Sequence, residues 1–324
     1  MTLDRRKKFT AGLSVASNTV LVLGKLTIGF WINSVSVISE AVHSGIDLVA
    51  SVIALVAVRE ASKPADHEHP FGHGKAEAIS GAFEGMLIFV AIVIIVYEAV
   101  KKIVHGAGVL RVDWGLLVMG VSAGMNIIVS WQLYRVAKKA DSLALEADAI
   151  HLSTDVFTSL GVFAGLLLIR ITRLQILDPL IALGVAVVIG HAAYDIIRRS
   201  VRDLMDEHIP EEEVAAVESV LNEHYRQFVG FHDLRSRKSG AHREIDLHLV
   251  LCRYTHLEEA HAIADHLEEE LKKRIPRAHI TIHMEPCERD CQEFQDRCEI
   301  EREKLEAHLS RDAKIRPAKP QSFE

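Results

Sequence analysis

The sequence has little cysteine and few aromatic residues, and both scarcities narrow what the chain can be. Only 6% of its 324 residues are aromatic, although 49% are hydrophobic. Its four cysteines all fall in the last third, at Cys252, Cys287, Cys291 and Cys298. This clustering does not resemble the disulfide framework of a secreted protein, so we expect a reduced, cytosolic environment. The last three would share one helical stripe, either as a soft-metal site or as ordinary reduced thiols.

Other absences exclude further classes. No His-Glu-x-x-His motif occurs, which removes a frequent signature of zinc hydrolases. The first apolar segment lacks a small-residue cleavage site and is too long for a typical signal sequence, so it predicts a retained helix. Charged residues are sparse in the first two thirds and crowded in the last third. That distribution, more than the net charge of −7, indicates a membrane domain followed by a polar one.

Six apolar segments in the first two thirds predict a six-helix transmembrane domain over residues 1–202. They cover approximately residues 11–32, 36–58, 79–100, 114–136, 145–169 and 177–197. Each is long enough to cross about 30 Å of hydrocarbon, which takes roughly 20 helical residues. Because basic residues crowd the N-terminus and every second connection, both termini are expected on the cytoplasmic side.

The pattern changes at residue 203. Helices are predicted over 211–228 and 256–274, and strands over 231–236, 243–252 and 278–284. This α-β-β-α-β order predicts a small cytoplasmic α+β domain over residues 203–286. A charged, cysteine-containing tail, residues 287–324, is expected to be helical to about residue 309.

Two copies of a His-x-x-x-Asp pattern lie inside apolar segments: His43 with Asp47, and His151 with Asp155. On a helix, residues four apart lie on one face, so each pair points at one spot. Two such helices facing each other offer a tetrahedral donor set suited to zinc. An aspartate at mid-membrane costs roughly 2.5–3.5 kcal/mol on the insertion scale, so it indicates a functional site. A single pair could serve only as an interhelical hydrogen bond, but two copies favour a metal site.

Other polar residues in the apolar segments include two asparagines and a lysine. Asn18 and Asn126 are interpreted as interhelical hydrogen bonders. Lys25 is expected to extend its amine toward the membrane interface.

Two other groups could bind metal. The loop after the second segment holds Asp66, His69 and His73, with His67 and Glu68 equally available, although such loops are often simply solvated. The polar domain holds His232, His248, His261, His283 and Glu285, which could also be ordinary half-exposed residues.

Together these residues resemble the cation diffusion facilitator family. The resemblance rests on the six apolar helices, the two His-x-x-x-Asp patterns, the loop Lys63–Glu77 and the stretch Gly230–Arg235. The loop reads Lys-Pro-Ala-Asp-His-Glu-His-Pro-Phe-Gly-His-Gly-Lys-Ala-Glu.

The resemblance implies roles by position. The two pairs would form a mid-membrane transport site, Asp66, His69 and His73 a loop site, and the five cytoplasmic-domain residues a binuclear site. Glu285 stands where bacterial zinc exporters have aspartate. Lys75 and Asp206 match a charge pair that joins the two domains and acts as a hinge. Similar proteins are homodimers that associate through the cytoplasmic domain.

The expected function is Zn²⁺ export from the cytoplasm by H⁺ antiport, with Zn²⁺ also bound to the cytoplasmic domain. Two histidines suit zinc, with Cd²⁺, Co²⁺ or Fe²⁺ as alternative substrates. His43 resembles the pattern of eukaryotic zinc carriers, but no histidine-rich insertion precedes the fifth helix, which favours a bacterial inner membrane. A passive metal channel or a membrane metal sensor is the alternative class. An intramembrane metalloenzyme is disfavoured because four protein ligands leave no position for water, and no feature suggests nucleic acid binding.

Overall fold

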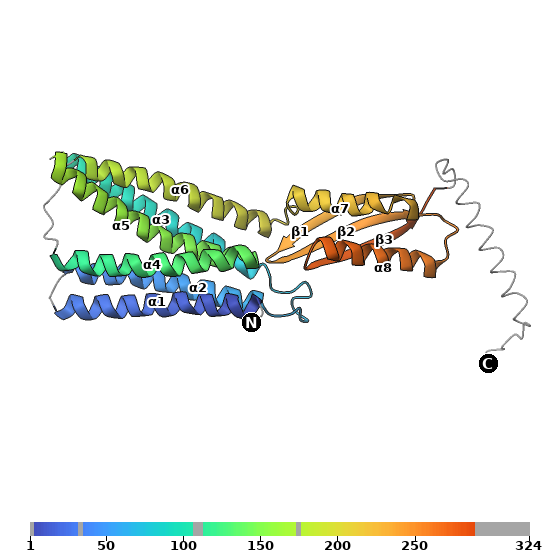
Figure 1. The fold of residues 1–324 in the computed structure, drawn as a ribbon, viewed down its shortest axis with the longest axis horizontal. Coiled ribbons are helices and arrows are strands. Elements are labelled where there is room, and N and C mark those ends of the chain that lie inside the picture. Colours follow the sequence, from blue (N-terminus) through green and yellow to red (C-terminus); the bar gives the residue numbers. More distant parts are fainter. Residues whose placement is uncertain (1–2, 32–34, 106–112, 173–175, 289–324) are drawn as a thin grey trace, which may run out of the picture. The chain divides into compact units, whose positions relative to one another are not determined.

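Six long helices form the first part of the fold (Figure 1). The computed structural model describes residues 3–31, 35–105, 113–172 and 176–288. The helices are α1 (Leu3–Trp31), α2 (Val35–Ala61), α3 (Ala76–His105), α4 (Asp113–Ala140), α5 (Leu143–Thr172) and α6 (Leu177–Leu204). The shortest, with 27 residues, is roughly 40 Å long at 1.5 Å per residue, which exceeds the hydrocarbon thickness. The six predicted helices are therefore confirmed, and each extends beyond its apolar stretch into polar turns.

Three helical segments have the composition of membrane spans. Within the described residues, the segments long and apolar enough to cross a membrane are Leu3–Ile28 in α1, Ala76–Lys101 in α3 and Pro179–Leu204 in α6. The two His-x-x-x-Asp pairs lie in α2 and α5, which have 27 and 30 residues. Both of these helices have the length that a membrane span requires.

Small residues hold the helices close together. One buried cluster joins α1, α2, α4 and α5 largely through alanines, among them Ala11, Ala57, Ala137 and Ala149. Between α3 and α6 the close approach depends on glycine. A Cβ on Gly85 would lie 2.5 Å from Cγ1 of Ile197, and a Cβ on Gly81 would lie 2.7 Å from Oγ of Ser200. Such small-x-x-x-small spacing is a common device for packing helices in lipid.

The second part is a small α+β domain. Its elements are α7 (Glu211–Glu223), a short 3₁₀ turn (Tyr225–Gln227), β1 (Gly230–Ser239), β2 (His242–Leu251), α8 (Leu257–Arg274) and β3 (Ala278–Pro286). The sheet order is β1-β2-β3, and β2 runs parallel to β3 with His248 opposite His283. The α-β-β-α-β order is confirmed. The first helix, however, ends at Glu223 and not near Phe228, because the chain tightens into the 3₁₀ turn that buries Phe228.

Alternation along β2 divides the sheet into two faces. Ile245, Leu247, Leu249 and Leu251 are buried, and they pack with Leu267 and Leu271 of α8 in one core. The opposite face carries Asp246, His248 and Val250. The histidine therefore lies on the face turned away from the hydrophobic core, where it can meet a ligand.

The chain divides into two compact units. The first comprises residues up to Met205 with Ser239–Ala241, and the second begins at Asp206. Cys287 is buried at the end of β3, and Cys252 is half-buried. Cys291, Cys298 and the predicted helix of the tail lie outside the described residues.

Candidate metal sites

The two His-x-x-x-Asp helices meet through Asp47 of α2 and His151 of α5. The Nε2 atom of His151 lies 3.1 Å from Oδ1 of Asp47, and the side chains are only 8% and 6% exposed. The other ring nitrogen, Nδ1, is buried and has no hydrogen-bond partner among the described residues. The contact thus orients the imidazole and leaves a nitrogen available for a ligand.

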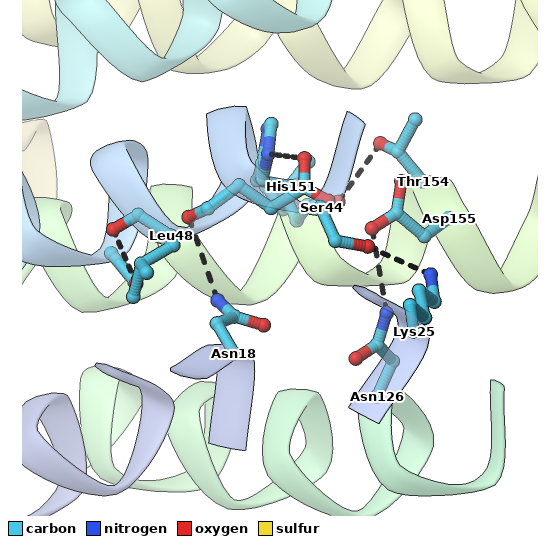
Figure 2. Close-up of polar contacts among 11 residues, drawn as sticks. Asn18, Lys25, Ser44, Leu48, Asn126, His151, Thr154 and Asp155 are labelled. Atoms are coloured by element: carbon cyan, nitrogen blue, oxygen red, sulfur yellow. Dashed lines mark hydrogen bonds and ion pairs between the residues drawn. The ribbon is translucent and has the colours of Figure 1, made fainter. Parts of the chain in front are cut away.

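Asp155 follows one helical turn beyond His151 (Figure 2). Nδ2 of Asn126, from α4, donates to Oδ2 of Asp155 at 3.4 Å. Asn18, from α1, donates through Nδ2 to the backbone oxygen of Asp47 at 3.5 Å. Both asparagines therefore bond between helices, as predicted. His43 lies in α2, and its side chain lies outside the described part of the structure.

The expectation for Lys25 is wrong. Its side chain does not extend to an interface, because the residue is only 5% exposed and its Nζ donates to Oγ of Ser44 at 2.7 Å. Ser44 directly follows His43 in α2. A hydroxyl inside the bundle thus accepts a hydrogen bond from Lys25, and the lysine nitrogen lies beside the candidate transport site (Figure 2).

The loop residues Asp66, His69 and His73 come together. Nδ1 of His69 and Nε2 of His73 each lie 3.4 Å from a carboxylate oxygen of Asp66, and the imidazole centroids are 4.4 Å apart. Their donor atoms all fall within 4.8 Å of one another, as a metal ion requires. His67 and Glu68 are exposed and do not join this group.

A local turn positions Asp66. Its Oδ1 accepts the backbone N–H of His69 at 2.7 Å and of Glu68 at 3.0 Å, an arrangement typical of aspartate in turns. The backbone bond from His69, the neighbouring imidazole of His73 and the bond from Glu68 together lower the pKa of Asp66 despite some desolvation. The carboxylate is therefore ionised at neutral pH, as a metal ligand must be.

In the cytoplasmic domain, Glu285 of β3 gathers the strand histidines. Its Oε2 lies 3.0 Å from Nε2 of His232, and its Oε1 lies 2.9 Å from Nδ1 of His248 and 3.6 Å from Nε2 of His283. Partial desolvation raises the pKa of Glu285, but the contacts with His232 and His248 outweigh it and lower the pKa overall. Glutamate is long enough to span imidazoles on neighbouring strands.

Two residues modify the predicted cytoplasmic set. His261 lies exposed on α8, where its Nδ1 is 3.5 Å from Asp265, and it belongs to none of the groups of clustered donors found among the described residues. Asp233 instead joins His232 and His248 in such a group. Its φ of 51° is a left-handed conformation that aspartate tolerates better than most residues. The sequence offered no signal for Asp233 beyond its position next to His232.

Lys75 and Asp206 belong to different units, so their charge pair stays a prediction. Within the second unit, Nη1 of Arg237 lies 3.6 Å from Oδ2 of Asp206. The aspartate therefore has a basic neighbour that the sequence did not suggest.

Long apolar helices together with clustered donor groups are features of membrane proteins that transport metal cations. Residues 12–205 match the family described as cation efflux transmembrane domain, and residues 209–287 match the cation efflux protein cytoplasmic domain. The chain belongs to the cation efflux, or cation diffusion facilitator, family. It is therefore a transporter and not an enzyme.

Relatives match over most of their length. The chain is 35% identical to an uncharacterized transporter of Synechocystis over 79% of this chain and 82% of that protein. It is 34% identical to the cation-efflux pump FieF of Pectobacterium atrosepticum over 84% and 90% of the two chains. A solved structure of the Zn form of CzrB is 39% identical, with a TM-score of 0.24, and covers 25% of this chain and 92% of that one.

Proposed function

We propose that this protein exports Zn²⁺ from the cytoplasm in exchange for protons. The proposed ligands of the transported ion are His43, Asp47, His151 and Asp155. The observation that carries the proposal is the buried contact between Asp47 and His151, which links the two His-x-x-x-Asp helices. Imidazole and carboxylate donors together suit zinc better than the all-oxygen sites that magnesium and calcium prefer.

The same donors account for proton coupling. Zinc binds neutral imidazole and ionised carboxylate, so each ion that enters competes with protons for the ligands. On the external side, protonation releases zinc; on the cytoplasmic side, deprotonation reloads the site. The proposed cycle alternates access by rigid-body movement of helices around a fixed site. The unpartnered Nδ1 of His151 supports this scheme because it leaves one donor atom open to either ion.

The cytoplasmic domain is proposed to form the contact of a homodimer and to bind regulatory zinc. The convergence of His232, His248 and His283 on Glu285 supports a metal site there. Zinc at this site would favour one arrangement of the two protomers, which is a population shift. The Lys75–Asp206 pair is the proposed hinge, and Asp66 with its two histidines a loop site for incoming metal.

The proposed location is the bacterial inner membrane, with both termini cytoplasmic. Lysine and arginine in short connections support this orientation. Lys63 precedes Asp66, His69 and His73 in the 62–75 connection, and Lys138 and Lys139 lie in the last turn of α4. That connection and the end of α4 would thus face the cytoplasm.

Transport assays in proteoliposomes test the site. Asp47→Ala and Asp155→Ala should abolish zinc uptake driven by a pH gradient, while Glu98→Gln, an exposed change on α3, should leave it intact. Wild-type rates in either aspartate variant would remove these ligands from the proposal. A panel of Zn²⁺, Cd²⁺, Co²⁺, Fe²⁺ and Mn²⁺ identifies the main substrate, and a higher rate with another metal would replace zinc.

A further inference from the structure

Some buried carboxyl groups of the helical unit form an ion pair with a basic side chain, and others do not. Five are buried among the described residues: Asp47, Glu77, Glu84, Glu146 and Asp148. Three have a nitrogen partner: Lys7 for Glu77, His151 for Asp47, and Lys138 with Arg199 for Glu146. Across the same residues, Glu84 and Asp148 have neither an ion pair nor a hydrogen bond to a basic side chain.

These two side chains are completely enclosed. Glu84 of α3 is 0% exposed; its Oε1 accepts from Oγ of Ser80 at 3.2 Å, and its Oε2 has no hydrogen-bond partner within the described ranges. Asp148 of α5 is also 0% exposed, and neither of its carboxylate oxygens has a hydrogen-bond partner there. The hydroxyl of Ser14, from α1, is buried, lacks a hydrogen bond of good geometry and faces Asp148. Three helices therefore contribute oxygen atoms with unused bonding capacity.

Glu84 and Asp148 lie at matching levels of two packed helices, since a Cβ on Gly81 would lie 3.8 Å from Cβ of Leu143 and Ile150 packs against the cluster that contains Ile88. At that separation the charges of the two carboxyl groups interact. Asp148 also interacts electrostatically with Asp47 and His151. Asp148 precedes His151 by three residues, which corresponds to about 4.5 Å along the helix axis. Asp148 is therefore nearer than His151 to Leu143, the first residue of α5. Glu84 and Asp148 thus lie beside the candidate transport site, between it and the end of the bundle where α5 begins.

Two carboxylates enclosed without a counter-charge are unfavourable, because burial removes their hydration and their charges repel. A divalent cation would neutralise both charges at once and would use the unpartnered oxygens as ligands. We propose that Glu84 and Asp148, with the hydroxyl of Ser14, form a second cation subsite next to the transport site. It takes a divalent cation through oxygen donors alone and passes that cation to the histidine-containing site.

This inference rests on the proposed function, since the subsite serves the same transported cation. A subsite that concentrates the ion before the transport site lowers the KM for metal. The maximal rate is set mainly by the cycle of the transport site. Loss of the subsite should therefore raise the KM for metal and leave the maximal rate nearly unchanged.

The test measures initial Zn²⁺ flux against Zn²⁺ concentration for the full chain in liposomes. Glu84→Gln and Asp148→Asn keep side-chain size and remove the charge, and the matched control is Glu98→Gln, an exposed carboxylate on the same helix as Glu84. We expect both buried variants to raise the KM for Zn²⁺ at least tenfold with the maximal rate within twofold of wild type. Glu84→Asp, which restores the charge, should recover most of the lost affinity, and the control should match wild type.

Equilibrium Zn²⁺ binding provides a second readout that does not need transport. In an Asp155→Asn background, the further change Glu84→Gln should remove one bound Zn²⁺ per protomer. An unchanged KM together with unchanged binding stoichiometry would overturn the subsite and make the pair a neutral structural element. If Asp155→Asn alone retains full flux, the proposed transport site fails, and the subsite is then judged by binding alone.

Discussion

The buried ion pair between Lys7 of α1 and Glu77 of α3 gives a sharp test of how the helices are held together. Its side chains are 6% and 1% exposed, and Ser142 also donates to the Glu77 carboxylate. Removing one partner leaves the other charge enclosed without compensation, which typically costs about 3–5 kcal/mol. Lys7→Met should therefore lower the free energy of unfolding by about that amount.

Removing both charges should be far less harmful. In Lys7→Met/Glu77→Gln no isolated charge remains, and such replacements are often close to neutral. The double-mutant cycle should thus yield a coupling energy of about 3 kcal/mol, measured by equilibrium denaturant titration of the full chain in mixed micelles.

An exposed pair on the same α3 helix serves as the control. Lys101 and Glu98 are 3.8 Å apart, with side chains 56% and 52% exposed. Their coupling should lie below about 1 kcal/mol, because solvent screens exposed ion pairs. Equal coupling energies for the buried and exposed pairs would refute the reasoning that burial controls the cost.

Three further predictions concern packing and metal binding. Gly85→Val should separate α3 from α6 because its Cβ would lie 2.5 Å from Ile197, whereas Gly190→Val, with 3.7 Å to its nearest neighbour, should be tolerated; equal thermal stability would contradict this. Glu285→Gln should weaken zinc binding about tenfold at pH 7, because it removes a donor whose lowered pKa keeps it ionised there; an unchanged affinity in calorimetry would count against the assignment. Asp66→Asn should preserve the turn, since an amide oxygen accepts the same N–H groups, but should lose one bound Zn²⁺ in equilibrium dialysis; full occupancy would argue against the loop site.

The helices and the kind of site could be predicted because they follow from local pattern. Apolar length determines the six helices, and i,i+4 spacing puts each histidine and aspartate on one face. The pairing of Asp47 with His151 then follows from the cost of leaving such groups alone in lipid.

What could not be predicted depends on distances between helices. The sequence predicts that Lys25 reaches the membrane interface, because a sequence pattern cannot show that Oγ of Ser44 lies 2.7 Å from its Nζ. Similarly, Glu77 and Glu84 are both acidic residues in α3, and only the packed structure shows that one has a lysine partner while the other has none. Asp233 lies in a donor group with His232 and His248 and has a left-handed backbone angle, and composition reveals neither feature.

The central claim is obligatory exchange of Zn²⁺ for protons, and it is tested most directly by measuring both ions in the same liposomes. With the purified chain reconstituted and no zinc gradient, an imposed pH gradient should drive saturable zinc accumulation. Reversing the pH gradient should reverse the zinc movement, and a zinc gradient should move protons in the opposite direction. Zinc flux that fails to saturate, or that proceeds without proton movement, would contradict the account and identify a passive pathway.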